Sequence, residues 1–508
     1  MRSNNFFFKL AALAAAFAFF AIIFSSCKIK RGSDETTTSE AAEITERNVP
    51  AGVLTVPYTT LDSLNPFVTK SLLNSSLTSL VFRSLYVTDA GFMPVADLAK
   101  ASSVQGKNVS VTLTEGIFFS DGTELTAADV LYSFAKAKPS PVYAQSLKNV
   151  ESCDSNGRFD LNFTLTRADV NVLSILTFPI VKNGTAETEE SLPIGAGRYV
   201  YQKGELRTNL VCNMKYGGEI PKIGTVRLYN VTVSESLMHL LDIGEIDCFF
   251  TDLSEGSAKR TYSSVNEVYL NDLVFIGVNS AEFPLNTADM RKALSMACNR
   301  QRIVENAFMN HARITEIPLN TAWTNIINSK EQIYTASDSD ETAANALLKT
   351  LGYGADGNPL TLKLIYTDTG SFTRNTASLL AENLKKVNIT LETSKLEKDA
   401  YETALANGDY DLYLGEVKLT KNMDLSCFFD DGGSVSYGIA ADAAVRSRYF
   451  AYMSGAESLD AFIRSFNESV PFIPLCFRNG QFCYSRTVGG TVEVTEDNLF
   501  GSIDKWKI

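Results

Sequence analysis

Apolar and polar residues follow two different rhythms along most of the chain. Residues 108–113 alternate with a period of two, as in a half-buried strand, whereas Val130, Leu131 and Phe134 lie on one face of a helix. Both patterns recur towards the C-terminus, with predicted strands at 246–250, 274–279, 360–366 and 389–393 and predicted helices at 234–241, 287–298, 299–309 and 373–386. Alternating strands and helices predict an α/β fold.

Two local signals in residues 116–130 set the start of one helix. Asp121 and Gly122 form a strong turn signal. Thr126 then caps the helix, and Asp129 stands three residues later, as in a capping box. Folding alone accounts for these residues, so we expect them to be structural.

The N-terminus carries an export pattern. Arg2 and Lys9 precede an apolar run at 10–24, which ends at Ser25-Ser26-Cys27. This run is too short for a typical spanning helix and fits a secretory signal. The stretch 24–27 resembles the bacterial lipobox, with Phe24 where Leu is usual. We therefore expect 1–26 to be a lipoprotein signal peptide, Cys27 to be lipidated, and the Ser-, Thr- and Glu-rich residues 27–50 to be a flexible tether; an uncleaved anchor is the alternative.

Length and charge narrow the possibilities. A chain of 508 residues exceeds the roughly 250–300 residues that one hydrophobic core supports, so it needs two or more lobes. Its net charge of −12 disfavours nucleic acid and anionic lipid as partners. No second apolar stretch reaches the length of a membrane span, so we expect a soluble body.

The eight cysteines give little chemistry. Apart from Cys27 they are widely spaced, with no C-x-x-C, which indicates buried thiols and no zinc site. One alternative stays open. If Asn479-Gly480 formed a hairpin turn, Cys476 and Cys483 would face each other across it and could form a disulfide.

No catalytic motif stands out. Residues 352–357 fit G-x-G-x-x-G, but they follow a helical pattern and precede a strand, the reverse of a dinucleotide-binding fingerprint. The two histidines, His239 and His311, lie in no metal-binding or nucleophile motif. We therefore expect no enzyme activity, no cofactor and no metal site.

Eight stretches carry a family resemblance. The most specific is 116–130, which reads GIFFSDGTELTAADV. It resembles the hallmark stretch of peptide- and nickel-type solute-binding lipoproteins of ABC importers, the dipeptide/oligopeptide-binding protein family. Further stretches follow in the family's order at 81–86, 94–99, 193–199, 241–247, 290–300, 408–412 and 471–475.

The resemblance implies a two-lobed periplasmic-binding-protein-like fold, class II type, enlarged with an extra subdomain and with the ligand cleft between the lobes. It also implies two segments that cross between lobes, which we expect near 198–202 and 478–484. The predicted division is a lobe 1 core of 51–80, 196–275 and 478–508, a lobe 1 accessory domain of 81–195, and a lobe 2 of 276–477.

The resemblance also places a ligand clamp. In peptide-binding members an acidic residue after the strand near 412 pairs with the ligand's amino group. Aligning on Asp424-Leu425 puts Lys421 at that position, and a buried ammonium favours an anion. Two alternatives remain: Lys421 is solvated, or the alignment slips and Glu416 or Asp424 serves as the clamp. The predicted ligand-binding residues are Asn65, Asn74, Trp323, Glu416, Lys421, Asp424, Ser436 and Tyr437.

The predicted function is the substrate-binding subunit of an ABC importer, which captures a short peptide and delivers it to permease subunits. We expect a monomer, outside the cytoplasm and lipid-anchored to the bacterial membrane, with no nucleic-acid partner. An anionic non-peptide solute and a sensory or adhesive lipoprotein of the same fold are the alternatives.

Overall fold

The computed structural model describes residues 50–205, 208–254, 262–281, 283–331, 339–355, 357–368, 370–439 and 443–508. The predicted signal peptide and the predicted lipidation site Cys27 lie outside these residues. Within the described ranges, no helix combines the length and apolar character needed to cross a membrane.

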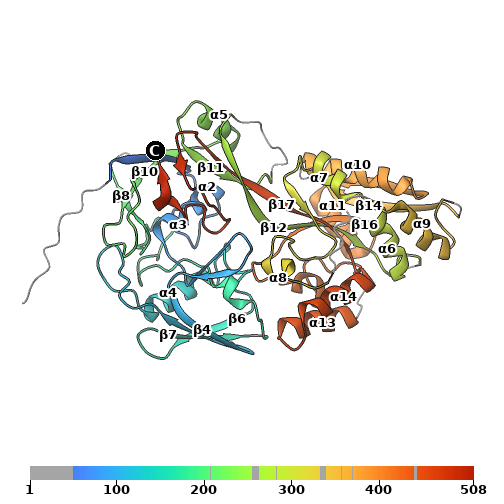
Figure 1. Cartoon of the computed structure of the whole chain (residues 1–508), viewed down its shortest axis with the longest axis horizontal. Helices are drawn as coiled ribbons and strands as arrows, with labels where there is room; N and C mark the ends of the chain where they lie inside the picture. The colour runs from blue at the N-terminus through green and yellow to red at the C-terminus, as the bar shows by residue number, and fades with distance from the viewer. Residues whose placement is uncertain are drawn as a thin grey trace, which may run out of the picture. The chain divides into compact units, whose positions relative to one another are not determined.

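Lobe 1 is built on two four-stranded sheets (Figure 1). In the first, β1 pairs in parallel with β10, and β9 and β8 continue it in antiparallel pairing. The second, the accessory sheet, is wholly antiparallel in the order β4-β5-β7-β6. The strands are β1 (Gly52–Tyr58), β10 (Ile223–Asn230), β9 (Thr208–Cys212), β8 (Tyr199–Lys203), β4 (Ala99–Gln105), β5 (Asn108–Leu113), β7 (Asp160–Leu165) and β6 (Val150–Ser155).

Short helices and turns cover these sheets. The amphipathic α4 begins after the predicted capping residue Thr126, whose backbone N–H and hydroxyl both bond to the Asp129 carboxylate. Val130 and Phe134 point from α4 into the lobe 1 core. The helices of this lobe are α2 (Leu72–Ser75), α3 (Thr78–Val81), α4 (Ala127–Ala137) and α5 (Leu237–Asp242), with single 3-10 turns at Val172–Ile175, Ser234–Ser236 and Ile503–Lys505.

A seven-stranded sheet carries the chain from lobe 1 into lobe 2. Its path is β11-β17-β12-β16-β14-β15, with β13 beside β17. Parallel pairing of β14 with β15 and β16 contrasts with the antiparallel pairing around β12 and β17. The strands are β11 (Cys248–Thr251), β17 (Ile473–Tyr484), β12 (Ser264–Val278), β16 (Leu412–Lys418), β14 (Leu360–Thr367), β15 (Ile389–Leu396) and β13 (Ala312–Ile314).

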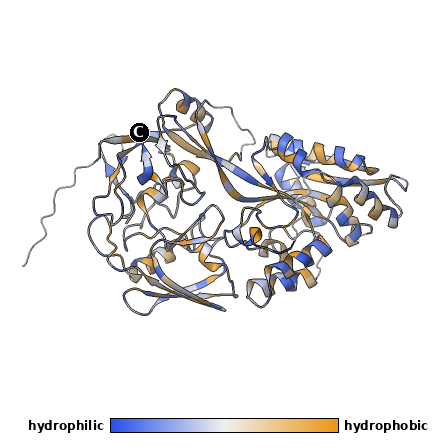
Figure 2. Cartoon of the chain, in the orientation of Figure 1, coloured by the Kyte–Doolittle hydropathy of each residue, from blue (hydrophilic) through white to orange (hydrophobic). Residues whose placement is uncertain are grey.

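Amphipathic helices supply the other half of lobe 2. Figure 2 shows hydrophobic and hydrophilic residues interleaved along these helices, as expected where one face packs on a core. Their apolar faces join the strands in two buried clusters. The helices are α6 (Ala288–Ala297), α7 (Arg300–Asn306), α8 (Thr324–Ile327), α9 (Glu341–Thr350), α10 (Ser371–Lys385), α11 (Lys398–Asn407), α12 (Ser426–Phe429), α13 (Ala443–Met453) and α14 (Leu459–Ser469).

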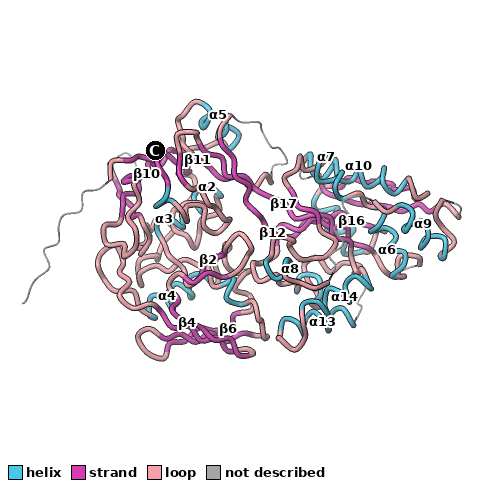
Figure 3. The backbone as a smooth tube through the Cα atoms, viewed as in Figure 1, coloured by secondary structure: helices cyan, strands magenta, loops and turns pink. Residues whose placement is uncertain are grey.

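The strands that cross between lobes are β12 and β17 (Figure 3). They pair from Ser264 opposite Tyr484 to Ile276 opposite Ile473. The crossing predicted at 478–484 lies in β17. The one predicted at 198–202 is wrong, because β8 pairs only with β9 inside the first sheet of lobe 1. The motif at 193–199 leads into β8, the edge strand of that sheet. A motif of a few residues does not determine which other strand β8 pairs with.

The alternative disulfide is also wrong. Asn479 and Gly480 lie inside the continuous strand β17, so they form no hairpin turn, and Cys476 and Cys483 are free, buried thiols. Asn479 pairs with Tyr269 and Gly480 with Val268 of β12. Tertiary pairing has overridden a strong turn dipeptide.

A small hairpin links lobe 1 to lobe 2 a second time. Strands β2 (Tyr86–Thr88) and β3 (Pro94–Ala96) hold Phe92 at their tip, and this side chain is buried in a lobe 2 cluster with Trp323 and Ile317. The backbone N–H of Thr324 donates to the Gly91 carbonyl at 3.1 Å. A final pair, β18 (Gly489–Gly490) and β19 (Trp506–Lys507), closes the C-terminal segment in lobe 1.

Arg300 is one of the buried arginines of lobe 2, and it bonds to main-chain carbonyls of several segments. Arg300 is 1% exposed, and its Nε donates to the carbonyls of Thr315 at 2.9 Å and Pro474 at 3.0 Å. Replacing it with Leu leaves these carbonyls unpaired, so we expect Arg300→Leu to lower the free energy of unfolding by about 3–5 kcal/mol in urea denaturation. The matched change Arg302→Leu, at an exposed ion pair with Glu382, should cost less than about 1 kcal/mol. Equal effects would contradict this role.

Candidate functional site

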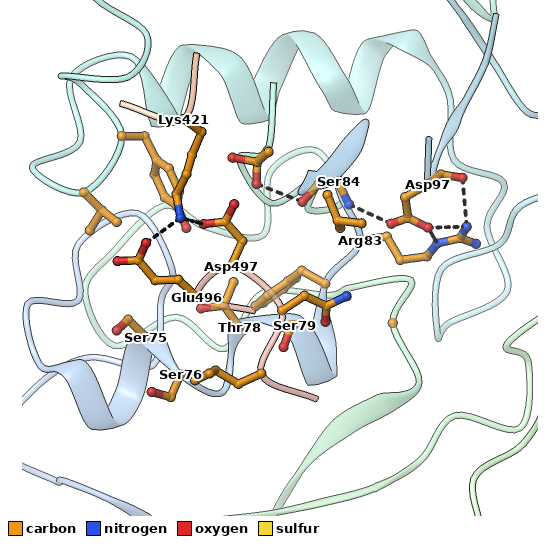
Figure 4. Close-up of a pocket in the computed structure, with 18 of the residues that line it drawn as sticks. Ser75, Ser76, Thr78, Ser79, Arg83, Ser84, Asp97, Lys421, Glu496 and Asp497 are labelled. Carbon is orange, nitrogen blue, oxygen red and sulfur yellow. Dashed lines mark hydrogen bonds and ion pairs between the residues drawn. The ribbon is translucent and has the colours of Figure 1, made fainter. Parts of the chain in front are cut away.

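A cavity of about 420 Å³ with several hydroxyl-bearing and charged residues in its lining lies between the lobes (Figure 4). Hydroxyl-bearing residues around α2 and α3 form its lobe 1 wall, together with the ion pair of Arg83 with Asp97, 2.6 Å apart. Lys418 and Lys421 of lobe 2 face that wall. The C-terminal segment contributes Glu496, Asp497, Asn498 and Leu499.

Two predicted ligand-binding residues support this wall from behind. Asn74 is 3% exposed; its Oδ1 accepts from the Thr59 N–H at 2.8 Å, and its Nδ2 donates to the carbonyls of Thr59, Asp62 and Ser63. Asn65 is likewise buried and donates to the Thr188 carbonyl at 2.9 Å. Neither lines the cavity. Asn74 thereby ties α2, whose C-terminal end presents Ser75 and Ser76 to the cavity, to the loop at residues 59–63.

Lys421 enters the cavity, and its charge is matched inside the protein. Its Nζ forms ion pairs with Glu496 and, at 3.3 Å, with Asp497, and lies 5.5 Å from the centre of the Phe92 ring. Lys418 also pairs with Glu496, at 2.5 Å. Burial opposes ionisation of Glu496, but the two lysines prevail and lower its pKa to about 2. Lys418 and Lys421 are therefore already ion-paired with the carboxylates of Glu496 and Asp497.

Asp424 lies at a contact between lobe 2 and the accessory sheet. Its carboxylate accepts from the Tyr449 hydroxyl at 2.7 Å and from the Ser426 N–H at 2.9 Å, where α12 begins. Arg167, which follows β7, lies 3.7 Å from Asp424 and donates to Asp430 at 2.8 Å. Asp424 does not line the cavity between the lobes.

A second compartment of about 860 Å³ opens on the lobe 2 side. Glu416 and Tyr437 line this second compartment. Lys418 of β16 lines both compartments, so the two compartments are neighbours. Glu416 is ion-paired with Arg478 of the crossing strand β17. Thus the structure brings Glu416, Lys421 and Tyr437 to one cleft with two compartments.

The other predicted residues lie outside these compartments. The Ser436 hydroxyl donates to the Gly433 carbonyl at 2.9 Å beside Tyr437. Trp323 is 1% exposed, precedes α8 and packs in the lobe 2 core. Among the residues that the structure describes, no three His, Cys, Asp or Glu side chains gather as metal ligands would.

Sequence reasoning missed several charged residues of the cleft, among them Asp272, Lys418, Glu496 and Asp497. Glu496 and Asp497 come from a C-terminal segment without any motif, 75 residues or more after their lysine partners. Asp272 carried a usable signal, because an acidic residue is unusual inside an apolar strand such as β12.

One edge of β16 is open in the second compartment. On one side β16 pairs with β12 along its whole length, from Leu412 to Lys418. On the other side β14 reaches only Leu412 and Tyr413. The Leu419 N–H donates to the Asn271 carbonyl of β12. In an antiparallel pair, successive residues direct their N–H and C=O groups alternately towards and away from the partner strand. The N–H and C=O groups of Lys418 and Glu416 therefore face away from β12, towards the cavity.

Comparison with known proteins identifies the chain's relatives. Residues 93–424 match the model of "Bacterial extracellular solute-binding proteins, family 5 Middle", which is more than half of the chain. The chain belongs to this family of solute-binding proteins. The family identified from the sequence motifs is thereby confirmed, and its members are extracellular solute-binding proteins rather than enzymes.

Curated relatives of this solute-binding protein are distant. The "Probable D,D-dipeptide-binding periplasmic protein DdpA" of Escherichia coli (strain K12) is 25% identical over 62% of the chain and 63% of its own length. The oligopeptide-binding protein AppA of Bacillus subtilis (strain 168) is 26% identical over 63% of the chain and 68% of its own length. The chain thus spans less than two thirds of the length of DdpA.

The structural match is more extensive. The unliganded open form of the periplasmic murein tripeptide-binding protein MppA gives a TM-score of 0.75 at 18% identity, covering 91% of this chain and 98% of MppA. Such a likeness shows the fold, and it confirms the predicted two-lobed α/β architecture.

The pairing of Lys421 in this solute-binding protein has a measurable consequence. The pKa of Glu496 is lowered from 4.5, so its ion pairs stabilise the folded state above that pH and are lost as the pH falls towards 2. We expect Lys421→Met to lower the free energy of unfolding by about 1–3 kcal/mol at pH 7, and by less at pH 3, in urea denaturation. Lys398→Met, at an exposed lysine, is the control. A loss independent of pH would contradict the pairing.

Proposed function

We propose that this protein is the substrate-binding subunit of an ABC importer and that it captures a short peptide between its lobes. The observation that carries the proposal is the open edge of β16 in the cleft. An extended peptide can add to such an edge as a further strand, with its main chain bonded to the outward-facing groups of Glu416 and Lys418.

The composition of the cleft supports the same ligand class. Serine and threonine hydroxyls line the lobe 1 wall, and most charged groups in both compartments already have protein partners. Such a surface suits a ligand that is held largely by its backbone. The internal pairing of Lys421 argues against the anionic solute, because the two carboxylates it holds occupy the place of the anion.

The partners follow from the same proposal. Permease subunits of an importer would recognise the closed arrangement of the lobes, and lipidation of Cys27 would keep the protein near them as a membrane-anchored monomer. Relatives support a peptide, since they include a probable D,D-dipeptide-binding, an oligopeptide-binding and a murein tripeptide-binding protein.

Closure is the first test. Calorimetric titration with peptides of two to five residues should give saturable heat, and small-angle scattering should show a smaller radius of gyration at saturation. Absence of both across a mixed-sequence library would overturn the peptide proposal.

Backbone recognition is the second test. N-methylation of one ligand amide that bonds to β16 removes a donor, so it should weaken binding about tenfold, the equivalent of about 1.4 kcal/mol. Exchange of ligand side chains of similar size should change the affinity less. Affinity governed by side chains and indifferent to N-methylation at every position would contradict addition to the β16 edge.

A further inference from the structure

Asp272 lies in an irregular stretch of the crossing strand β12. Tyr269 pairs with Asn479 of β17, but the next paired residues are Leu273 and Phe477, so three residues of β12 stand opposite Arg478 alone. Such a bulge redirects side chains and is common beside functional sites. Here it directs the Asp272 side chain into the second compartment of the cleft.

The surrounding structure holds this bulge firmly. The Leu270 carbonyl accepts from Asn320 Nδ2 at 2.9 Å. Asn271 is fully buried; its Nδ2 donates to the Thr420 carbonyl at 2.9 Å and its own carbonyl accepts from the Leu419 N–H at 2.8 Å. The carbonyls of Leu270 and Asn271 and the Asn271 side chain thus have protein partners, whereas the Asp272 side chain faces the cavity.

The neighbouring cations are already paired. Lys418 is the cross-strand neighbour of Asp272, yet its Nζ lies 2.5 Å from Glu496. Arg478, opposite the bulge, is paired with Glu416. Within the described part of the chain, the Asp272 carboxylate has neither a hydrogen bond nor an ion pair.

The electrostatic state of Asp272 agrees with this geometry. Burial raises its pKa to about 6, and Glu496 and Glu416 add to the rise, while Lys418 and Arg478 oppose it. At neutral pH the group is therefore largely ionised and half-buried, and no cation among the described residues forms an ion pair with it. A cation brought by a ligand would supply the missing charge.

We propose that Asp272 binds a primary ammonium group of the ligand and so makes the cleft selective for amine-bearing peptides. This inference rests on the proposed function, and it assigns the acidic role to the crossing strand because Lys421 is already bound to Glu496 and Asp497. The ammonium can come from a peptide's N-terminus or from a lysine side chain.

The test compares wild type with Asp272→Asn by calorimetric titration of three probes: Ala-Ala-Ala, N-acetyl-Ala-Ala-Ala and N-acetyl-Ala-Ala-Lys. Asp272→Asn should weaken binding of the amine-bearing probe at least tenfold and leave the acetylated trialanine unchanged. If the N-terminus is the source, acetylation should weaken wild-type binding equally. If lysine is the source, N-acetyl-Ala-Ala-Lys should bind wild type best. Unchanged affinity of Asp272→Asn for all three probes would overturn the inference.

A matched control and a second readout separate binding from structure. Asp399→Asn removes an exposed carboxylate at the start of α11, so it should leave binding unchanged. The pKa of Asp272 is raised, so ionisation lowers wild-type stability as the pH rises from about 4 to about 6. Asp272→Asn without ligand should therefore melt at a higher temperature than wild type at pH 7.5. A lower melting temperature would show a structural carboxylate instead.

Failure of the proposed function would look different. If wild type binds none of the three peptides, the peptide proposal is in doubt, and Asp272 is then tested with 1,4-diaminobutane as the probe. This amine should raise the melting temperature of wild type and not that of Asp272→Asn. Equal effects on both proteins would overturn the role of Asp272.

Discussion

The antiparallel pairing of β12 with β17 is the constraint on which the rest of the structure depends. These two strands carry the chain between the lobes and also form the middle of the seven-stranded sheet. Because ladder hydrogen bonds resist sliding, the lobes can move mainly by bending or twisting of this pair. The bulge at Asp272 and the side chain of Arg478 both belong to this pair, so the sheet that limits the motion also lines the cleft.

Charge pairing in the cleft follows from this arrangement. Lys418 and Lys421 come from β16 and the loop behind it, whereas Glu496 and Asp497 come from the C-terminal segment, which packs in lobe 1. Their ion pairs therefore bring the two lobes together across the cavity. In a chain with a net charge of −12, these lysines are held by the protein's own carboxylates, and within the described residues the Asp272 carboxylate is left without an ion-pair partner.

The accessory sheet joins the lobes at a separate place. Arg167 pairs with Asp430 of lobe 2, and the buried Asp169 accepts from Asn422 at 2.7 Å. Burial raises the pKa of Asp169 to about 6. The tip residue Phe92 adds an apolar anchor in lobe 2. These contacts link the accessory domain to the lobe 2 loop that carries Lys421 and Asp424. They act in addition to the crossing strands β12 and β17.

The sequence by itself determined the α/β class, the family, several helices and their caps. The caps depend on signals only a few residues long, such as Thr126 with Asp129, and the structure contains this contact. Helix and strand periodicity also located α6, α10, β14 and β15 to within a few residues at each end. In the candidate site, the sequence directed attention to Glu416, Lys421 and Tyr437, which line the cleft.

Only the tertiary structure decided which strands cross and which charges meet. Asn479-Gly480 has the composition of a turn but pairs inside β17, and β8 stays within lobe 1. Lys421 acquired partners from a segment 75 residues away, whereas the Asp272 carboxylate has no ion-pair partner in the part of the chain that the structure describes. The physical reason is that pairing, burial and charge compensation depend on distances through space between segments remote in sequence, whereas caps and periodicity depend on neighbours along the chain.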